Sequence, residues 1–390
     1  MQFTRLPNGI RVLSEELPDL ASVTVGIWVE NGSRYEEPAQ AGISHFLEHL
    51  FFKGTARRTA AGIAEAIDAV GGWLNAFTGR ETTCYHAKVL PEHLPLALDV
   101  LADMFTASQF AVEEIDRERT VIVQEISQVE DAPDEYVHEL FGQAFWPGHP
   151  LARPVLGTAA TVGALTREDF LNFLAAHYPA NRILVAAAGR LKHEDLVQVV
   201  AQQLGGVGGS AMVGTGSPPR VHAGVTVHRK DLEQVHLCLG APGIASGDPD
   251  RYAAQVLNVA LGGGMSSRLF QEISEKRGKA YTIGSFLSSY LDAGYVGVYA
   301  GTSAESVREV VQVIRAELTA VAHEGLRAAE LERAKSQRKG NILLGLETSD
   351  SRMSRIANNE IYFGREVPLE EVAAGIEAVA NDDVVRVASR

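Results

Sequence analysis

The chain has 390 residues, of which 46% are apolar and 22% charged, and its formal net charge is −14 at pH 7. This length supplies core material for two or three domains, and the acidic balance argues against a general nucleic-acid-binding protein, which needs a basic face. No apolar run approaches the roughly 18 to 20 residues that cross a bilayer, and the two cysteines, Cys84 and Cys238, give no disulfide framework, so we expect no membrane partner and a cytoplasmic location.

The first half of the chain predicts strands followed by helices. Residues 1–19 read as a β-hairpin around Pro7-Asn8-Gly9, because these residue types favour a tight turn. The remaining predictions, in chain order, are a strand at 22–32, helices at 43–52 and 60–70, a strand pair at 73–90, a helix from about Leu94, a helix at 113–130, and a strand and helix from 182.

The second half repeats this order after a break in composition. Residues 203–220 are rich in glycine, serine and proline, which indicates a linker. Strands are then predicted at 224–231 and 233–243, a helix at 251–263, strands within 280–301 and a helix from about Ala304. We therefore predict domains at 1–203 and 221–390 joined by a linker at 204–220. The fold class is α+β, with two homologous halves that each form a mainly antiparallel sheet covered by helices.

The helix predicted at 43–52 carries titratable residues in an apolar segment, "GISHFLEHLFFKGT". His45 and His49 are four residues apart, so both face one side of a helix and can bind one ion, and imidazole nitrogen suits zinc. Glu48 lies beside them, and H-x-x-E-H is a zinc-peptidase motif. The alternative is an amphipathic helix with solvated histidines. Against it, the matching helix at 251–263 keeps the apolar residues but lacks all three titratable ones.

A catalytic zinc usually has three protein ligands, so two histidines leave one ligand to find. The helix at 113–130 carries Glu118 and Glu125, which are seven residues apart and share a face. Glu125 stands among apolar residues, where an unpaired carboxylate is costly. Spacing alone does not choose between these two glutamates.

The sequence resembles the pitrilysin/insulinase family of zinc peptidases (M16), and most closely its short-chain branch, which includes the mitochondrial processing peptidase. The resemblance covers nearly the whole chain, in the stretches "LPNGIRVLSEELP", "AGISHFLEHLFFKGT", "LNAFTGRETTCYHAKVL", "ERTVIVQEISQVEDAPDE", "LTREDFLNFLAAHYPANRILVAAAG" and "GGGMSSRLFQEISEKRGKAYTIGSF". It implies two halves that face each other as a clamshell, with the 204–220 linker as hinge.

The resemblance also implies roles for individual residues. His45, His49 and Glu125 match the zinc ligands, with one Zn²⁺ per chain. Glu48 matches the general base, and Glu118 matches a second, supporting acid of the catalytic centre.

Further residues match the family's substrate-binding positions. Phe52 matches a residue of the pocket for the side chain after the cleaved bond, and Asn75 and Ala76 match an edge strand that pairs with the peptide. The family also contributes an arginine and a tyrosine from the second half, for which packing or surface roles are equally open here. The candidates for that pair are Arg268, Tyr281 and Tyr299.

These features predict a zinc-dependent endopeptidase that hydrolyses peptides or unfolded segments. The resemblance to the family implies in addition that the chain forms a homodimer. One alternative is an inactive peptidase-like scaffold or partner subunit, which predicts loss of the ligand residues. The other is a structural zinc-binding protein without turnover. That protein would need a fourth ligand, for which Cys84 and His86 are candidates.

Overall fold

The structure is a computed structural model, and it describes residues 1–211, 214 and 216–390. The chain forms two compact units, and each unit draws on several parts of the sequence. Unit 1 consists of Met1–Gln128, Arg153–Thr215 and Leu346–Glu366, and unit 2 of Val129–Ala152, Gly216–Gly345 and Val367–Arg390. Relative to the predicted domains, the units exchange two helices. Helix α5 (Pro133–Phe145) belongs to unit 2 and helix α12 (Ser349–Phe363) belongs to unit 1.

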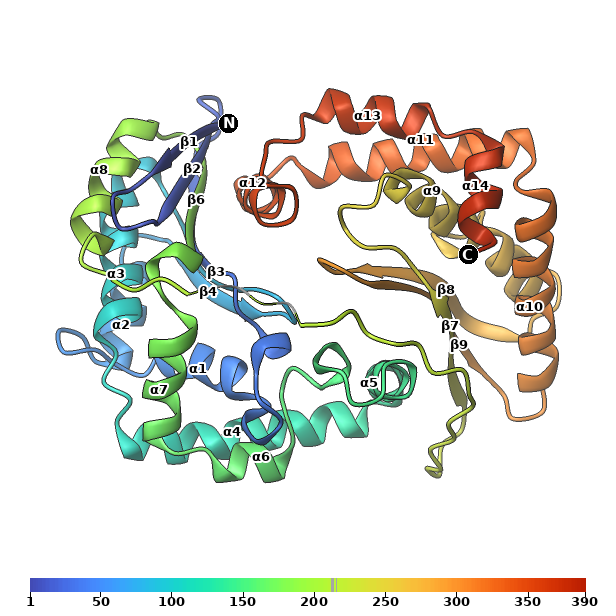
Figure 1. The fold of residues 1–390 in the computed structure, drawn as a ribbon, viewed down its shortest axis with the longest axis horizontal. Coiled ribbons are helices and arrows are strands. Elements are labelled where there is room, and N and C mark those ends of the chain that lie inside the picture. Colours follow the sequence, from blue (N-terminus) through green and yellow to red (C-terminus); the bar gives the residue numbers. More distant parts are fainter. Residues whose placement is uncertain (212–213, 215) are drawn as a thin grey trace. The chain divides into compact units, whose positions relative to one another are not determined.

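Unit 1 contains a six-stranded sheet in the order β1-β2-β6-β3-β5-β4 (Figure 1). Its strands are β1 (Gln2–Arg5), β2 (Arg11–Glu16), β3 (Val23–Val29), β4 (Trp73–Thr78), β5 (Thr83–Val89) and β6 (Ile183–Gly189). β1 and β2 form the hairpin predicted around Pro7-Asn8-Gly9. All pairings are antiparallel except that of β2 with β6, and β4 lies at the edge of the sheet.

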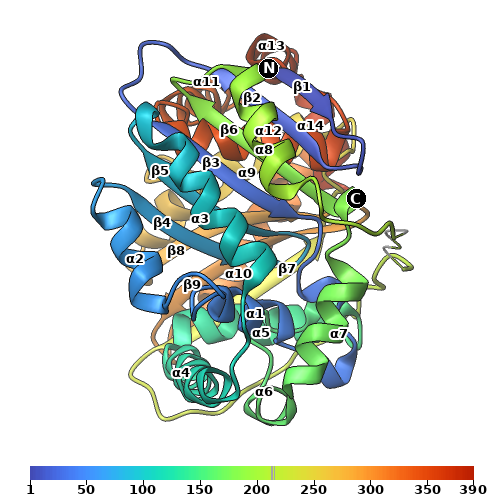
Figure 2. The same cartoon turned by 90° about the vertical axis from the view of Figure 1, so that its left-hand side faces the viewer.

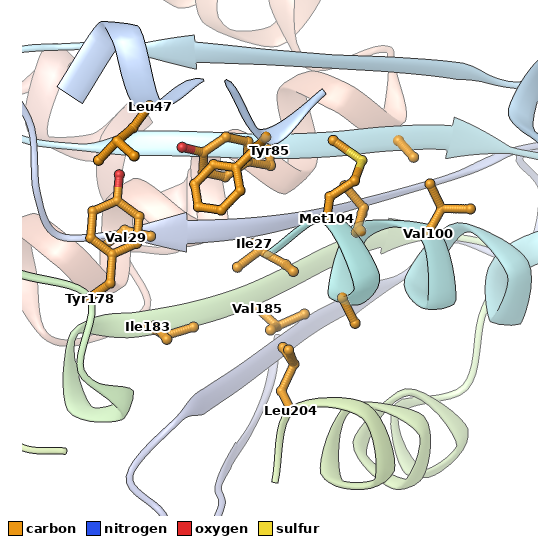
Figure 3. Close-up of a cluster of buried hydrophobic side chains, with 14 of the residues drawn as sticks. Ile27, Val29, Leu47, Tyr85, Val100, Met104, Tyr178, Ile183, Val185 and Leu204 are labelled. Carbon is orange, nitrogen blue, oxygen red and sulfur yellow. The ribbon is translucent and has the colours of Figure 1, made fainter. Parts of the chain in front are cut away.

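Helices cover both faces of this sheet. The remaining helices of unit 1 are α1 (Ile43–Phe51), α2 (Ala60–Asp68), α3 (Leu94–Ala107), α4 (Val112–Asp131), α6 (Ala159–Ala164), α7 (Arg167–His177) and α8 (His193–Leu204). α3 and α8 lie in front of the strands in Figure 2, and the core between them and the sheet includes Ile27, Val185 and Leu204 (Figure 3). α12 packs on the opposite face, where Met353 meets Trp28 and Cys84.

Unit 2 has a three-stranded antiparallel sheet in the order β7-β9-β8, formed by β7 (Val235–Pro242), β8 (Ala280–Ser289) and β9 (Gly294–Thr302). Its other helices are α9 (Arg251–Gly262), α10 (Val307–Glu324), α11 (Ala328–Gly345), α13 (Leu369–Glu377) and α14 (Asn381–Ala388), with a π-helical turn at Phe270–Glu275. α9 and α10 bury the main core of this unit on one face, and α5 packs on β7 with an aromatic cluster around Phe141 and Tyr295.

The prediction of a strand at 224–231 is wrong. Among the described residues this segment has no strand pairing, and Val225 is 92% exposed. In unit 1 the corresponding β2 is held by β6, which lies between β2 and β3. No described strand of unit 2 pairs with the outer edge of β7. The segment contacts helical residues of the same unit: Lys230 donates to the carbonyl of Glu130, and the ring of His228 packs against Tyr136.

No helix of the described residues combines the length and the apolarity that a bilayer crossing requires.

Candidate metal centre

The start of α1 is held by a buried acid. The Glu36 carboxylate accepts the backbone N–H groups of Gly42 and Ser44, each at 2.9 Å, and so satisfies donors that a helix start leaves open. Gly42 has a φ of +96°, and a Cβ there would lie 2.6 Å from the carbonyl oxygen of Leu156. Glycine is therefore needed for both its conformation and its size.

The sequence of α1 then divides the helix into two faces. Phe46, Leu47 and Leu50 are buried in the core of unit 1. His45 and His49 occupy the other side, one turn apart, with their ring centroids separated by 4.7 Å. The apolar residues fix the rotation of the helix, and this rotation aims both imidazoles in one direction.

Glu125 of α4 meets both imidazoles. Its Oε2 lies 3.7 Å from Nε2 of His45 and 3.7 Å from Nε2 of His49, and one ligand atom of each residue lies within 4.8 Å of the other two. A tetrahedral zinc with bonds of about 2.0–2.1 Å separates its ligand atoms by about 3.3 Å. The donor set and its spacing therefore fit a zinc ion with small side-chain adjustments.

Glu118 precedes Glu125 by seven residues, about two turns, on α4. It contacts the other ring nitrogen of His49, Nδ1. Its Oε2 lies 3.0 Å from Nδ1 of His49, and its Oε1 lies 2.8 Å from Nζ of Lys53. We assign the Nδ1–H of His49 as the donor, which leaves the Nε2 lone pair directed toward Glu125. The geometry thus separates the two glutamates that spacing left equivalent: Glu125 is within ligand range and Glu118 orients a histidine.

Burial also shifts the pKa values of His45 and Glu48. Burial, with a smaller effect of the neighbouring His49, lowers the pKa of His45 to about 4, so its imidazole is neutral at pH 7. Burial raises the pKa of Glu48 above its ordinary value, although Thr78 and His49 act in the opposite direction. Within the described residues, Oε2 of Glu48 is buried without a hydrogen-bond partner. A buried carboxylate oxygen without a partner is uncommon and calls for an explanation, such as a polar group that joins it in the functional state.

Comparison with known proteins identifies the chain. A model of the family described as "Insulinase (Peptidase family M16)" matches residues 11–159, and "Peptidase M16 inactive domain" matches residues 164–338. The chain is 44% identical to an uncharacterized zinc protease of Streptomyces coelicolor, over 99% of this chain and 86% of that one. The chain belongs to peptidase family M16. It is also 40% identical to an uncharacterized zinc protease of Bacillus subtilis, over 95% of this chain and 91% of the relative.

Solved structures have the same fold as this M16 chain. A protease from Helicobacter pylori superposes with a TM-score of 0.91 at 23% identity, covering 99% of this chain and 95% of the other. A structure described as the peptidase M16 inactive domain from Pseudomonas fluorescens has a TM-score of 0.92 at 20% identity, covering 100% and 94%. The two-domain α+β fold expected from the sequence is confirmed.

The predicted substrate-binding residues of the first half lie near α1 or on the sheet edge. Phe52 caps the C-terminus of α1 and packs against the core of unit 1. Asn75 and Ala76 lie on β4, the edge strand, opposite His86 and Tyr85 of β5. Their role in binding a peptide stays a prediction, and the free edge of β4 is compatible with it.

The candidates from the second half have different surroundings within unit 2 of this M16 chain. Arg268 donates to Glu330 at 2.8 Å and lies 3.6 Å from Glu317, which is the environment of a structural ion pair. Tyr281 is 91% exposed. The Tyr299 hydroxyl lies 2.9 Å from Nδ1 of His236. That any of the three binds substrate stays a prediction.

Cys84 and His86 do not join the ligand group. Cys84 packs with Trp28 on the α12 face of the sheet, whereas α1 lies on the opposite face. His86 is two residues further along β5 and therefore points to the same face as Cys84, where Asp350 of α12 influences its pKa. The geometry of unit 1 thus provides no fourth protein ligand from this pair.

Sequence reasoning missed Lys53. Its signal was available, because Lys53 follows His49 by four residues in the "FKGT" stretch. The partner, Glu118, comes from another helix, and no local pattern identifies such a partner.

Proposed function

We propose that this M16 protein is a zinc-dependent endopeptidase that hydrolyses peptides or unfolded segments. One observation carries the proposal: His45, His49 and Glu125 converge with ligand spacing while Glu48 keeps a buried, unpartnered carboxylate oxygen beside them. A closed structural site would have a fourth protein ligand in place of this arrangement. An inactive relative would have lost some of these four residues.

The residues of the centre have separate tasks. A zinc ion held by His45, His49 and Glu125 would polarise the scissile carbonyl and make an adjacent water more acidic. Glu48 then accepts the proton of the attacking water and delivers it to the leaving amine. General acid–base help of this kind contributes roughly 10²–10⁴-fold to the rate. The position of Glu48 on the same helix turn as His49 keeps the base beside the reacting carbonyl.

The edge strand β4 supplies a way to hold an extended peptide. An open sheet edge pairs with the backbone of an added strand before it selects side chains. Thr78, at the end of β4, influences the pKa of Glu48, so a peptide on this edge would run past the base. This arrangement favours unfolded chains over compact folded proteins as substrates.

The experiment that tests the proposal compares the wild-type protein with Glu48→Gln. Both proteins are loaded with zinc, their metal content is measured, and a mixed peptide library is incubated with each and analysed by mass spectrometry. We expect wild-type cleavage and at least a 10²-fold loss in the variant at equal zinc content. Equal cleavage by both proteins would refute the role of Glu48, and zinc binding without wild-type cleavage would refute the peptidase.

Two further expectations accompany this function. A homodimer is proposed, and light scattering coupled to size-exclusion chromatography measures it directly. A cytoplasmic location is likewise proposed, and fractionation of cells that express the tagged chain would test it.

A further inference from the structure

Three polar side chains of unit 1 are connected in a row that begins at the proposed ligand His49 and ends at the partly exposed Lys53. Nδ1 of His49 lies 3.0 Å from Oε2 of Glu118, and Oε1 of Glu118 lies 2.8 Å from Nζ of Lys53. The two oxygens of one carboxylate therefore have different partners, one on each side. Glu118 itself is only 3% exposed.

The burial of Glu118 makes its partners important. A carboxylate removed from water without compensation is strongly unfavourable, and its charge is tolerated when a cation and hydrogen bonds replace the solvent. Lys53 is the only lysine or arginine paired with Glu118 in the described part of the chain. Because Lys53 pairs with Oε1 of Glu118, Oε2 of the same carboxylate can accept a hydrogen bond from Nδ1 of His49.

The position of Lys53 is fixed by α1 itself. Its backbone N–H donates to the carbonyl of Leu50 at 3.1 Å, in the turn that closes the helix after His49. The same short segment therefore presents one proposed ligand and the cation that holds this ligand's hydrogen-bond partner. Helix α4 in turn carries both Glu118 and Glu125.

We propose that Lys53 is a positioning residue of the metal centre, acting through Glu118. Lys53 holds the Glu118 carboxylate in the orientation that accepts the Nδ1–H of His49, and this fixes the ring with Nε2 toward the metal. Hydrogen-bond partners of metal-bound histidines typically change metal affinity by 10–100-fold when they are removed. This inference rests on the proposed zinc centre and adds to it a residue outside the ligand set.

A comparable ion pair in the same unit provides the control. Nζ of Lys88 lies 2.9 Å from Oδ2 of Asp350, and both side chains are 32% exposed, close to the 30% of Lys53. Asp350 also accepts from Thr24, but it contacts none of the proposed ligands. Lys88→Met therefore removes a lysine of similar exposure and its ion pair without touching the centre, and its partner Asp350 is more exposed than Glu118, at 32% against 4%.

The experiment measures zinc affinity by competition with a chromophoric chelator. The wild-type protein is compared with five variants: Lys53→Met, Lys53→Arg, Lys88→Met, Glu118→Gln and the double variant Lys53→Met/Glu118→Gln. We expect Lys53→Met to weaken zinc binding by about tenfold. Lys53→Arg should retain most of the wild-type zinc affinity because it keeps the positive charge. Lys88→Met should bind zinc like the wild type. In the Glu118→Gln background, Lys53→Met should add no further loss.

Thermal unfolding of the metal-free proteins separates positioning from folding. Lys53→Met should unfold at a lower temperature than Lys88→Met, because it leaves the Glu118 charge buried without its cation. If both variants are folded at the temperature of the zinc assay and only Lys53→Met weakens zinc binding, the inference is supported. Unchanged zinc affinity of Lys53→Met, with normal wild-type binding, overturns this inference alone. A full additional loss in the Glu118→Gln background also overturns it, because Lys53 would then act by another route. Absence of zinc binding by the wild type overturns the proposed centre together with this inference.

Discussion

Glu36, the buried acid at the start of α1, should make the free energy of unfolding depend on pH. Burial raises the pKa of Glu36 from 4.5 to about 7, even though the N–H groups of Ser44 and Gly42 and the charge of Arg153 act to lower it. In the folded protein the group therefore binds a proton more readily than in the unfolded chain. Its contribution to stability is complete below pH 4.5 and is lost as the pH rises through 7.

The magnitude follows from the shift. A change of one pKa unit corresponds to 1.36 kcal/mol, so a rise from 4.5 to about 7 corresponds to about 3 kcal/mol between the two limits. Glu36→Gln removes this titration. The variant also replaces one of the two acceptors for Gly42 and Ser44 by an amide, which adds a constant cost of about 1–3 kcal/mol at every pH.

The assay is urea unfolding of the wild type and of Glu36→Gln at pH 5, 6, 7 and 8. We expect the stability advantage of the wild type to shrink by roughly 2–3 kcal/mol between pH 5 and 8. Glu37→Gln is the matched control, since its side chain is exposed. Parallel profiles of the wild type and Glu36→Gln across this range would show that the buried carboxyl does not titrate as argued.

Three further predictions concern other parts of the molecule. Gly262→Ala should destabilise unit 2 by about 1–3 kcal/mol in thermal unfolding, because its Cβ would lie 2.2 Å from the backbone nitrogen of Ser285, whereas Gly340→Ala in α11 has open space and should stabilise by about 0.5–1 kcal/mol. Burial opposes ionisation of Glu330, but hydrogen bonds from two arginines outweigh it and lower its pKa to about 2. The wild type should therefore lose stability as the pH falls from 4.5 to 2, and Glu330→Gln should lack this loss in acid unfolding monitored by circular dichroism. Removal of metal by a chelator should abolish peptide cleavage, and added zinc should restore it; cleavage that persists in metal-free protein would contradict the proposed chemistry.

Local patterns predicted most of unit 1 because its elements are strongly periodic. The hairpin at the N-terminus, α4 and the strand–helix pair β6 and α8 all lie where turn residues and hydrophobic periods placed them. The segment at 224–231 shows where this reasoning fails. Its alternation is that of a strand, but a strand also needs a neighbour, and the neighbour is not encoded locally.

The candidate metal centre was predictable in part for the same reason. The spacing of His45 and His49 is a local property of one helix, so the sequence alone pointed to a shared ion. Choosing between Glu118 and Glu125 requires the rotation of α4 against α1, which tertiary packing sets. The pairing of Lys53 with Glu118 likewise joins two helices that are distant in sequence.

The two halves of the chain allow α1, which carries the proposed ligands, to be compared with its counterpart α9, which carries none. α1 and α9 each follow a sheet strand and precede a strand hairpin, β4–β5 in unit 1 and β8–β9 in unit 2. In α9 the position of His49 is taken by Val259, which is buried in the core, and that of His45 by Gln255, which accepts a hydrogen bond from Arg338. In α9, which has no ligands to present, one of these two positions holds a core residue and the other a residue with an ordinary hydrogen bond. The imidazoles of α1 do not serve the fold, and their cost is explained by the ion that we propose they bind.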